Sequence, residues 1–210
     1  NKLDKGFETF MQQEDLNVSL VGVCDLFDVR AEQGIDASKN EVRPGGKPLE
    51  SATRYRYHEE LLKNDKIDAV IIATPDHWHA QIAMDAANAG KHVYCEKGLT
   101  RTFDEAIDLY DTVKRTGITF QLGHQNRQVE ANEKAKQIIK QGLLGDINLV
   151  ELATNRNSPW GAWVWDIHPE GNSKTIDWDT FQKPAPNKIG FGEEALKRFF
   201  RWRCWYDYGT

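Results

Sequence analysis

Three predicted β-strands in this chain each end in a cluster of polar residues, and this repetition restricts the folds open to it. The strands are apolar runs at residues 67–73, 91–95 and 118–122. The polar residues that follow them are Thr74-Pro75-Asp76-His77-Trp78-His79, Glu96-Lys97-Gly98 and Gly123-His124-Gln125-Asn126-Arg127. Amphipathic helical stretches separate the runs, so we expect parallel strands joined by helices in an α/β fold. Ligands bind beyond the carboxyl ends of the strands in such sheets, so all three clusters are expected to border one crevice.

Two further segments precede these strands. Residues 18–24 are mostly apolar and predict a buried strand that ends at Asp25. Residues 34–53, rich in Gly, Pro, Lys and Ser, predict a surface excursion before a short helix at residues 57–64.

Helix signals are clearest between the polar clusters. The Ala-rich segment 77–88 is followed by Gly90, a helix stop signal. Thr102 and Glu105 form a capping box that opens a helix ending at Gly117. The apolar side chains of that helix fall on one expected buried face: Phe103, Ala106, Ile107, Tyr110 and Val113.

The pattern changes after Arg127. We expect a helix at residues 130–141, a strand at 146–154, and then a long stretch rich in Trp, Pro and Gly. We therefore expect a domain boundary near residue 124, between a domain with parallel strands (1–123) and part of a second domain (124–210).

Both ends of the sequence predict an excerpt of a longer protein. Dinucleotide-binding folds begin with a strand and a Gly-rich turn at a helix N-terminus. Residues 6–13 instead resemble the tail of that first helix, and Gly45-Gly46 neither follows a strand nor opens a helix. We expect the first strand and its Gly-rich loop to be missing. An export signal would lie upstream of Asn1, which leaves cytoplasmic and periplasmic locations open.

Composition excludes several classes of function. The formal net charge of −5 gives no electrostatic reason to expect nucleic acid as a partner, and no apolar run approaches membrane-spanning length. Three cysteines without a close pair argue against a disulfide framework and against a thiolate metal site. Five of the seven tryptophans lie between Trp160 and Trp202, which suits either a sugar-binding cleft or, by default, a second core.

Asp25 is the first candidate site residue. An acidic side chain at the end of the second strand of a dinucleotide fold accepts hydrogen bonds from the adenosine ribose and repels a 2′-phosphate. Leu26 follows it, at a position where an NADP-binding enzyme more often has a small polar residue or an arginine. We therefore expect NAD rather than NADP. A solvated loop carboxylate is the alternative interpretation.

The segment that begins Thr74-Pro75 turns the chain from strand to helix, because proline cannot donate to a sheet ladder. His79 lies near the start of that helix, where it would either contact a ligand or have a purely structural role. His77 and His79 have no third ligand nearby, so no metal is expected.

Glu96 and Lys97 give the sharpest chemical signal. A lysine exchanges protons once a neighbouring positive charge, such as an oxidised nicotinamide ring, lowers its pKa. Oxidising an alcohol requires loss of the hydroxyl proton, which Lys97 would accept or relay while Glu96 orients it or binds a ribose. A surface salt bridge between the two side chains is the alternative.

The C-terminal segment interleaves arginines with aromatic residues between Arg198 and Tyr208. Cation–π stacking, recognition of a polar ligand, or packing between domains would each explain this pattern.

At these residues the chain resembles the glucose–fructose oxidoreductase / inositol dehydrogenase family, Gfo/Idh/MocA. The resemblance covers nearly the whole chain and rests on motifs in order. They are Val23-Cys24-Asp25, residues 67–80, residues 90–97, Gly123-His124-Gln125-Asn126-Arg127, Ile176-Asp177-Trp178-Asp179, Pro184-Ala185-Pro186, Arg201-Trp202-Arg203 and Tyr206-Asp207-Tyr208-Gly209-Thr210. The last four resemble a Trp-rich branch of the family.

The resemblance implies a Rossmann domain followed by an α/β domain with an open antiparallel sheet, and a homodimer or homotetramer in the full-length protein. It implies Lys97 as the catalytic residue. It also implies that Asp25, Thr74, Pro75 and Arg127 bind the cofactor. The residues themselves add further cofactor-binding candidates: His79, Glu96, Lys97, Trp202 and Arg203. The expected cofactor is NAD, and the expected substrate is a sugar, glycoside or polyol.

Two departures from the family matter. Gly98 stands where proline is usual, so the turn after Lys97 is expected to be less fixed and the lysine less well aimed. The family's later Asp and His residues are expected beyond Thr210.

Three functions remain open from the sequence. The preferred one is an NAD-dependent dehydrogenase that transfers hydride from a CH–OH group. The second is a glycosidase that oxidises its substrate transiently, eliminates, and retains NAD. The third is a sugar-binding protein that kept the fold without the chemistry.

Overall fold

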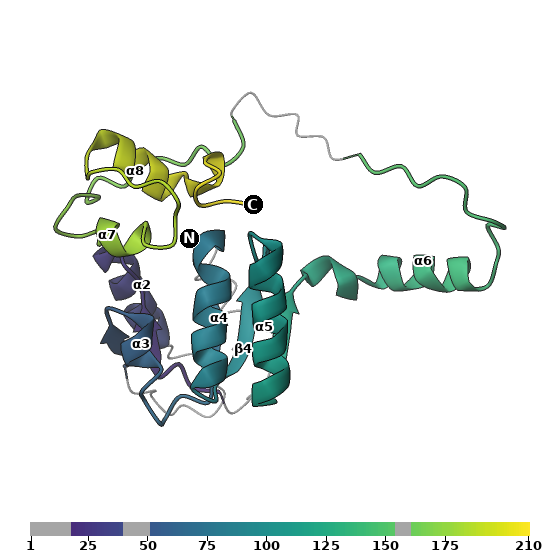
Figure 1. Cartoon of the computed structure of the whole chain (residues 1–210), viewed down its shortest axis with the longest axis horizontal. Helices are drawn as coiled ribbons and strands as arrows, with labels where there is room; N and C mark the ends of the chain where they lie inside the picture. Colours follow the sequence, from purple (N-terminus) through teal and green to yellow (C-terminus); the bar gives the residue numbers. More distant parts are fainter. Residues whose placement is uncertain (1–17, 40–50, 154–160) are drawn as a thin grey trace.

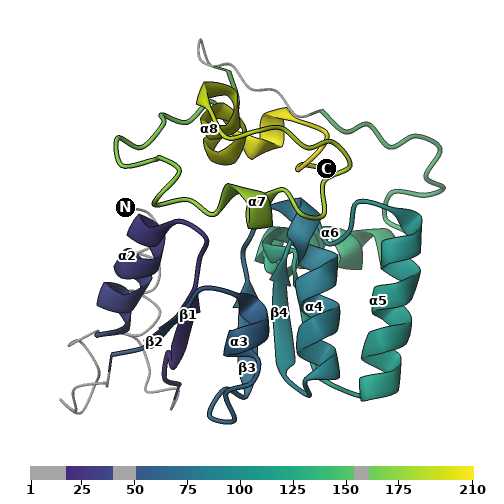
Figure 2. The same ribbon diagram turned by 60° about the vertical axis from the view of Figure 1, so that its left-hand side comes forward.

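The computed structural model describes residues 18–39, 51–153 and 161–210. Parallel strands form the lower half of the molecule in Figures 1 and 2, and the C-terminal residues form a layer across one end of them. The expected helix at residues 6–13 lies outside the described residues.

A three-stranded sheet contains the strands that the polar clusters follow. Its order is β3 (Ala69–Ile72), β4 (His92–Glu96) and β5 (Phe120–Gly123). Ala69 is opposite His92 and Val93 is opposite Phe120, and both pairings are parallel. The prediction of parallel strands joined by helices is therefore confirmed.

A second, two-stranded sheet pairs β1 (Gly22–Cys24) with β2 (Thr53–Tyr55), also in parallel. Among the described residues no strand joins β1 to β3. The predicted excursion at 34–53 is wrong at both ends, because helix α2 (Asp28–Ser38) occupies its start and β2 begins at Thr53.

The helices between the strands begin and end close to their predicted positions. They are α3 (His58–Leu61), the 3-10 turn η1 (Asp76–Trp78), α4 (His79–Asn88) and α5 (Phe103–Thr116). The Thr102–Glu105 capping box is present in both directions, with Thr102 accepting from the Glu105 amide. Gly117 ends α5 with a φ of 67°, a left-handed conformation that glycine adopts without strain.

One hydrophobic core lies between this three-stranded sheet and helices α3, α4 and α5. Ile72, Val93 and Cys95 from the sheet meet Ala83, Ala86 and Leu109 from α4 and α5. The predicted buried face of α5 is wrong in part. Phe103 is 80% exposed and Tyr110 62% exposed, whereas Leu109 carries the contact.

The chain then leaves the sheet. After η2 (Gln125–Gln128), helix α6 (Glu130–Lys140) projects away from the body of the molecule (Figure 1). The predicted strand at 146–154 is not formed over its described part, residues 146–153. The described residues after 124 contain no sheet, only an isolated antiparallel bridge between Ile176 and Phe27.

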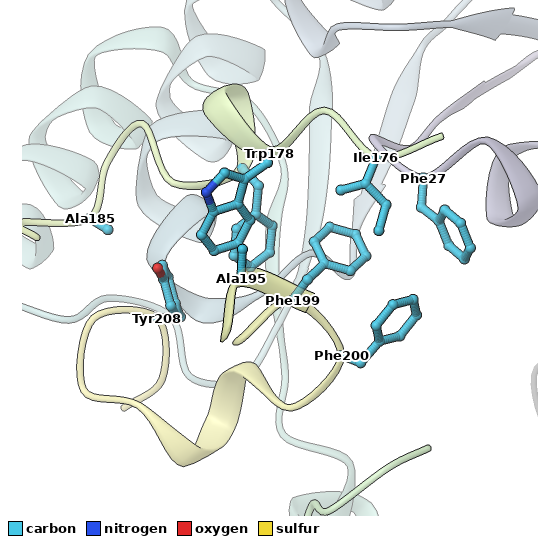
Figure 3. Packing of buried hydrophobic residues seen from close by; sticks show 9 residues of the cluster. Phe27, Ile176, Trp178, Ala185, Ala195, Phe199, Phe200 and Tyr208 are labelled. Atoms are coloured by element: carbon cyan, nitrogen blue, oxygen red, sulfur yellow. The ribbon is translucent and has the colours of Figure 1, made fainter. Parts of the chain in front are cut away.

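The C-terminal layer contains α7 (Trp178–Phe181), α8 (Glu193–Phe200) and the 3-10 turn η3 (Trp202–Cys204). Its side chains form an aromatic core that Figure 3 shows in detail: Phe27, Ile176, Trp178, Phe181, Ala185, Ala195, Phe199, Phe200 and Tyr208. Phe27 follows β1, so this core ties the C-terminal layer to the Rossmann part. Core packing, the default interpretation of the clustered tryptophans, holds for Trp178, while Trp165 is 60% exposed.

Candidate functional site at the carboxyl ends of the strands

A cleft of about 250 Å³ lies at the carboxyl ends of β1 and β3. Ligand pockets usually measure about 300–1,000 Å³, so this cleft is close to the lower end of that range. Asp25, Thr74 and Pro75 line it, and Thr180 and Phe181 of α7 close one side. The structure thus brings together residues from two strand ends and from the C-terminal layer.

The Asp25 carboxylate is held by its own loop. Its Oδ1 accepts a hydrogen bond of 2.8 Å from the Phe27 amide. Burial raises the pKa of Asp25, and the hydrogen bond and the positive charges of Arg30, Arg54 and Arg56 oppose that rise. The side chain is therefore a desolvated acceptor surrounded by cations.

The Thr74–Pro75 turn meets the cleft directly. The Thr74 hydroxyl is buried and has no hydrogen-bond partner among the described residues. A buried hydroxyl without a partner costs free energy, so a ligand with donor or acceptor groups would stabilise it.

His79 lies behind this turn and is 1% exposed. Its Nε2 is 2.7 Å from the Thr74 carbonyl oxygen, and its Nδ1 is 2.6 Å from the Gly98 carbonyl oxygen. Both ring nitrogens are thus used to connect two loops, which favours the structural role over direct ligand contact.

Glu96 is the last residue of β4 and Lys97 follows it, and neither side chain lines the cleft. Glu96 accepts hydrogen bonds from Gln125 Nε2 at 2.8 and 3.1 Å and from the Tyr94 hydroxyl at 3.3 Å. Lys97 is exposed, and no described residue forms a hydrogen bond or an ion pair with its amine. The structure therefore does not support the alternative of a Glu96–Lys97 salt bridge.

The turn after Lys97 is enclosed rather than open. A methyl group on Gly98 would lie 2.6 Å from Oγ1 of Thr210. The Thr210 hydroxyl and amide both donate to Oδ2 of Asp76, at 2.7 and 3.0 Å. Contacts on two sides, from His79 and Thr210, limit the freedom expected for a glycine at position 98.

The segment 206–210, which we call the tail, binds the loops after β3 and β4. The guanidinium of Arg101 donates to the carbonyl oxygens of Tyr206 and Asp207, the latter at 2.9 Å. The His77 amide donates to the Tyr208 carbonyl oxygen at 3.2 Å, and their rings are 5.0 Å apart. Sequence reasoning did not identify Asp76, Arg101 or Thr210 as partners, and no local motif pairs them.

The remaining predicted site residues lie on the same edge but apart from the cleft lining. Arg127 is exposed in η2. The Arg203 guanidinium lies 3.9 Å from the Trp202 ring centroid and 4.7 Å from that of Trp163. Cation–π stacking, one of the three explanations left open for this segment, is therefore present, and the negative charges of Asp76 and Glu96 act on Arg203.

Two classes of site are absent from the described residues. No group of three or more His, Cys, Asp or Glu side chains there could hold a metal ion. No helix in those ranges combines the length and the apolar character needed to cross a membrane.

Cys24, Cys95 and Cys204 are free thiols, and burial raises the pKa of Cys24 and of Cys95 to about 12.

Comparison with known proteins points to one family. A model of the Gfo/Idh/MocA oxidoreductase family, described as having an NAD-binding Rossmann fold, matches residues 7–124. The levoglucosan dehydrogenase of Pseudarthrobacter phenanthrenivorans is 38% identical over 135 residues, which cover 64% of this chain and 32% of that protein. The alpha-N-acetylgalactosaminidase of Shewanella oneidensis is 29% identical over 181 residues, which cover 85% of this chain and 37% of that protein.

Solved structures agree on the fold. The crystal structure of myo-inositol 2-dehydrogenase from Lactobacillus plantarum superposes with a TM-score of 0.56 at 28% identity, covering 70% of this chain and 40% of that one. The chain thus spans about a third of the two curated relatives described above.

Proposed function

The chain belongs to the Gfo/Idh/MocA oxidoreductase family with its NAD-binding Rossmann fold, and we propose that it forms part of an NAD-dependent dehydrogenase of a sugar or polyol. The main observation behind this proposal is that Asp25, Thr74 and Pro75 line one cleft. Lys97 lies at the end of β4, the strand next to β3 in the sheet. The names of relatives that act on levoglucosan and inositol support the substrate class.

The residues of the cleft fit the adenosine side of NAD. A ribose offers hydroxyls to the Asp25 carboxylate, and the unpartnered Thr74 hydroxyl supplies a further polar contact. Pro75 leaves no amide to compete for ligand atoms at the strand end. Bound NAD supplies the hydride-accepting ring, while the protein orients the substrate and excludes water.

Lys97 is proposed to accept the substrate hydroxyl proton at Nζ. Its amine has no described partner that would have to be displaced first. Glu96 is engaged by Gln125 and Tyr94, so we assign it to shaping the ribose side of the site rather than to pairing with the lysine.

Replacing Lys97 with methionine tests this assignment. Turnover with NAD and a panel of sugars and inositols should fall by about 10²–10⁴-fold, while NADH binding, followed by fluorescence titration, stays within a small factor. Lys66→Met is the matched control, because Lys66 is exposed and precedes β3 at the opposite end of the same sheet. Unchanged turnover in Lys97→Met would remove Lys97 from the mechanism.

A second function is favoured by one observation. The likeness to the alpha-N-acetylgalactosaminidase covers 181 residues, a larger share of the chain than the 135 shared with the levoglucosan dehydrogenase. A glycosidase that oxidises its substrate transiently and retains NAD would use the same Asp25 and Lys97. Absorbance at the NADH band separates the two: a dehydrogenase accumulates NADH, whereas the glycosidase releases sugar without net NADH.

A further inference from the structure

A carboxylate at the start of α2 holds two arginines beside the cleft. Arg54 and Arg56 both donate to Oδ1 of Asp28, the second at 2.5 Å. The arginines come from β2 and the residue after it, and Asp28 begins the helix that follows the Asp25 loop. All three side chains are partly exposed, at 29–35%.

We propose that Asp28 is a specificity-determining residue for the cofactor, because it withholds Arg54 and Arg56 from a 2′-phosphate and so favours NAD over NADP. This rests on the proposed function in one respect, namely that Asp25 binds the adenosine ribose.

The charges around Asp25 support this assignment. Among the described residues, Arg30, Arg54 and Arg56 are the cations that act on the Asp25 carboxylate. Asp25 and Asp28 offset two of them, and Asp177 Oδ2 lies 3.9 Å from Arg56 Nε. A 2′-phosphate would add nearly two negative charges to a neighbourhood whose carboxylates already balance its arginines.

All three arginines already contact other side chains. The Arg30 guanidinium lies 5.9 Å from the ring centroids of both Phe199 and Phe200. Arg54 and Arg56 are held by Asp28, whose pKa is lowered because these hydrogen bonds and charges outweigh its partial desolvation. Binding a phosphate would therefore require breaking an existing ion pair, at a cost that a free 2′-hydroxyl avoids.

Asp28→Asn tests the proposal by removing the charge while keeping the shape. NADH and NADPH are titrated into the purified protein, and cofactor fluorescence gives both dissociation constants. We expect NADPH to bind about tenfold more tightly in the variant and NADH to change by less than about threefold. Asp36→Asn is the matched control, because Asp36 lies on the same helix and its one ion pair with another described residue is to exposed Lys39.

The outcomes are distinguishable. If Asp28→Asn binds NADH but the ratio of its NADPH and NADH dissociation constants is unchanged, this proposal alone is overturned. An equal change of that ratio in Asp36→Asn overturns it as well. Absence of NADH binding in the wild type overturns the proposed function and this proposal together. Return of the ratio to its original value in the triple variant Asp28→Asn/Arg54→Gln/Arg56→Gln, which removes both released arginines, is the expected confirmation. Asp28→Ser gives the same comparison if the asparagine variant does not fold.

Discussion

A single methyl group added at Gly98 tests whether the tail holds the turn after Lys97. The new Cβ would lie 2.6 Å from Oγ1 of Thr210, closer than side-chain atoms approach in folded proteins. The Thr210 hydroxyl must therefore move, and it then loses its 2.7 Å hydrogen bond to Asp76. Asp76 is 6% exposed, so water does not readily replace that donor.

The expected cost follows from the type of hydrogen bond. A hydrogen bond to a charged group contributes about 1.5–3 kcal/mol, so Gly98→Ala should lower the free energy of unfolding by about that amount. Thr210→Ala should cost about the same, because it removes the same hydroxyl. The double variant should cost no more than Thr210→Ala alone, since the atom that collides with the methyl group is already gone.

Urea denaturation of the four proteins measures this double-mutant cycle. Gly190→Ala is the control, because a Cβ there has no neighbour within 4 Å. Its unfolding free energy should stay within about 0.5 kcal/mol of the parent or rise slightly. Additive losses at Gly98 and Thr210, or a neutral Gly98→Ala, would refute the reasoning.

Two further predictions concern stability. Burial lowers the pKa of His77 from 6.5 to about 4, so the unfolded chain takes up a proton between these pH values that the folded chain does not. The free energy of unfolding should therefore fall as pH drops through that window, and urea titrations of His77→Gln should show a flatter dependence. Removing the α5 cap with Thr102→Ala should cost about 1 kcal/mol in the same assay. Asp111→Ala, at an exposed position within α5, should cost less, and equal losses would count against the cap.

Local signals were enough to predict strands β3, β4 and β5 and the helices α4 and α5 between them. Pro75 precedes the 3-10 turn η1 after β3, Gly117 ends α5, and Thr102 with Glu105 begins α5 through contacts within four residues. Each of these depends on neighbours in the sequence, so no knowledge of the tertiary structure was needed.

Errors occurred where distant contacts decide the structure. Gly34 suggested a loop, but it lies in α2, where a Cβ would be 2.7 Å from Val23 of β1. Here glycine permits a close approach of helix and strand, and buried Ala31 anchors the same helix. The segment 146–153 has strand-like residues but no described partner strand, and a single strand is not stable alone.

In the candidate site, too, the residues with local signals could be predicted and the distant contacts could not. Asp25, Thr74 and Lys97 could be found from the sequence because each lies within two residues of the end of a strand, and parallel strands end at a common edge. The pairing of Asp76 with Thr210 spans 134 positions and has no local signature.

That long-range pair changes how Gly98 is understood. From the sequence, glycine in place of proline predicted a poorly aimed lysine. In the structure the missing side chain makes room for Thr210, whose hydroxyl is bound to Asp76 at the end of the neighbouring strand. The restriction that proline would impose within the turn is thus replaced by contacts from outside it, through His79 and the tail. If Lys97 is the proton acceptor, its aim depends on the C-terminal layer as much as on the sheet that carries it.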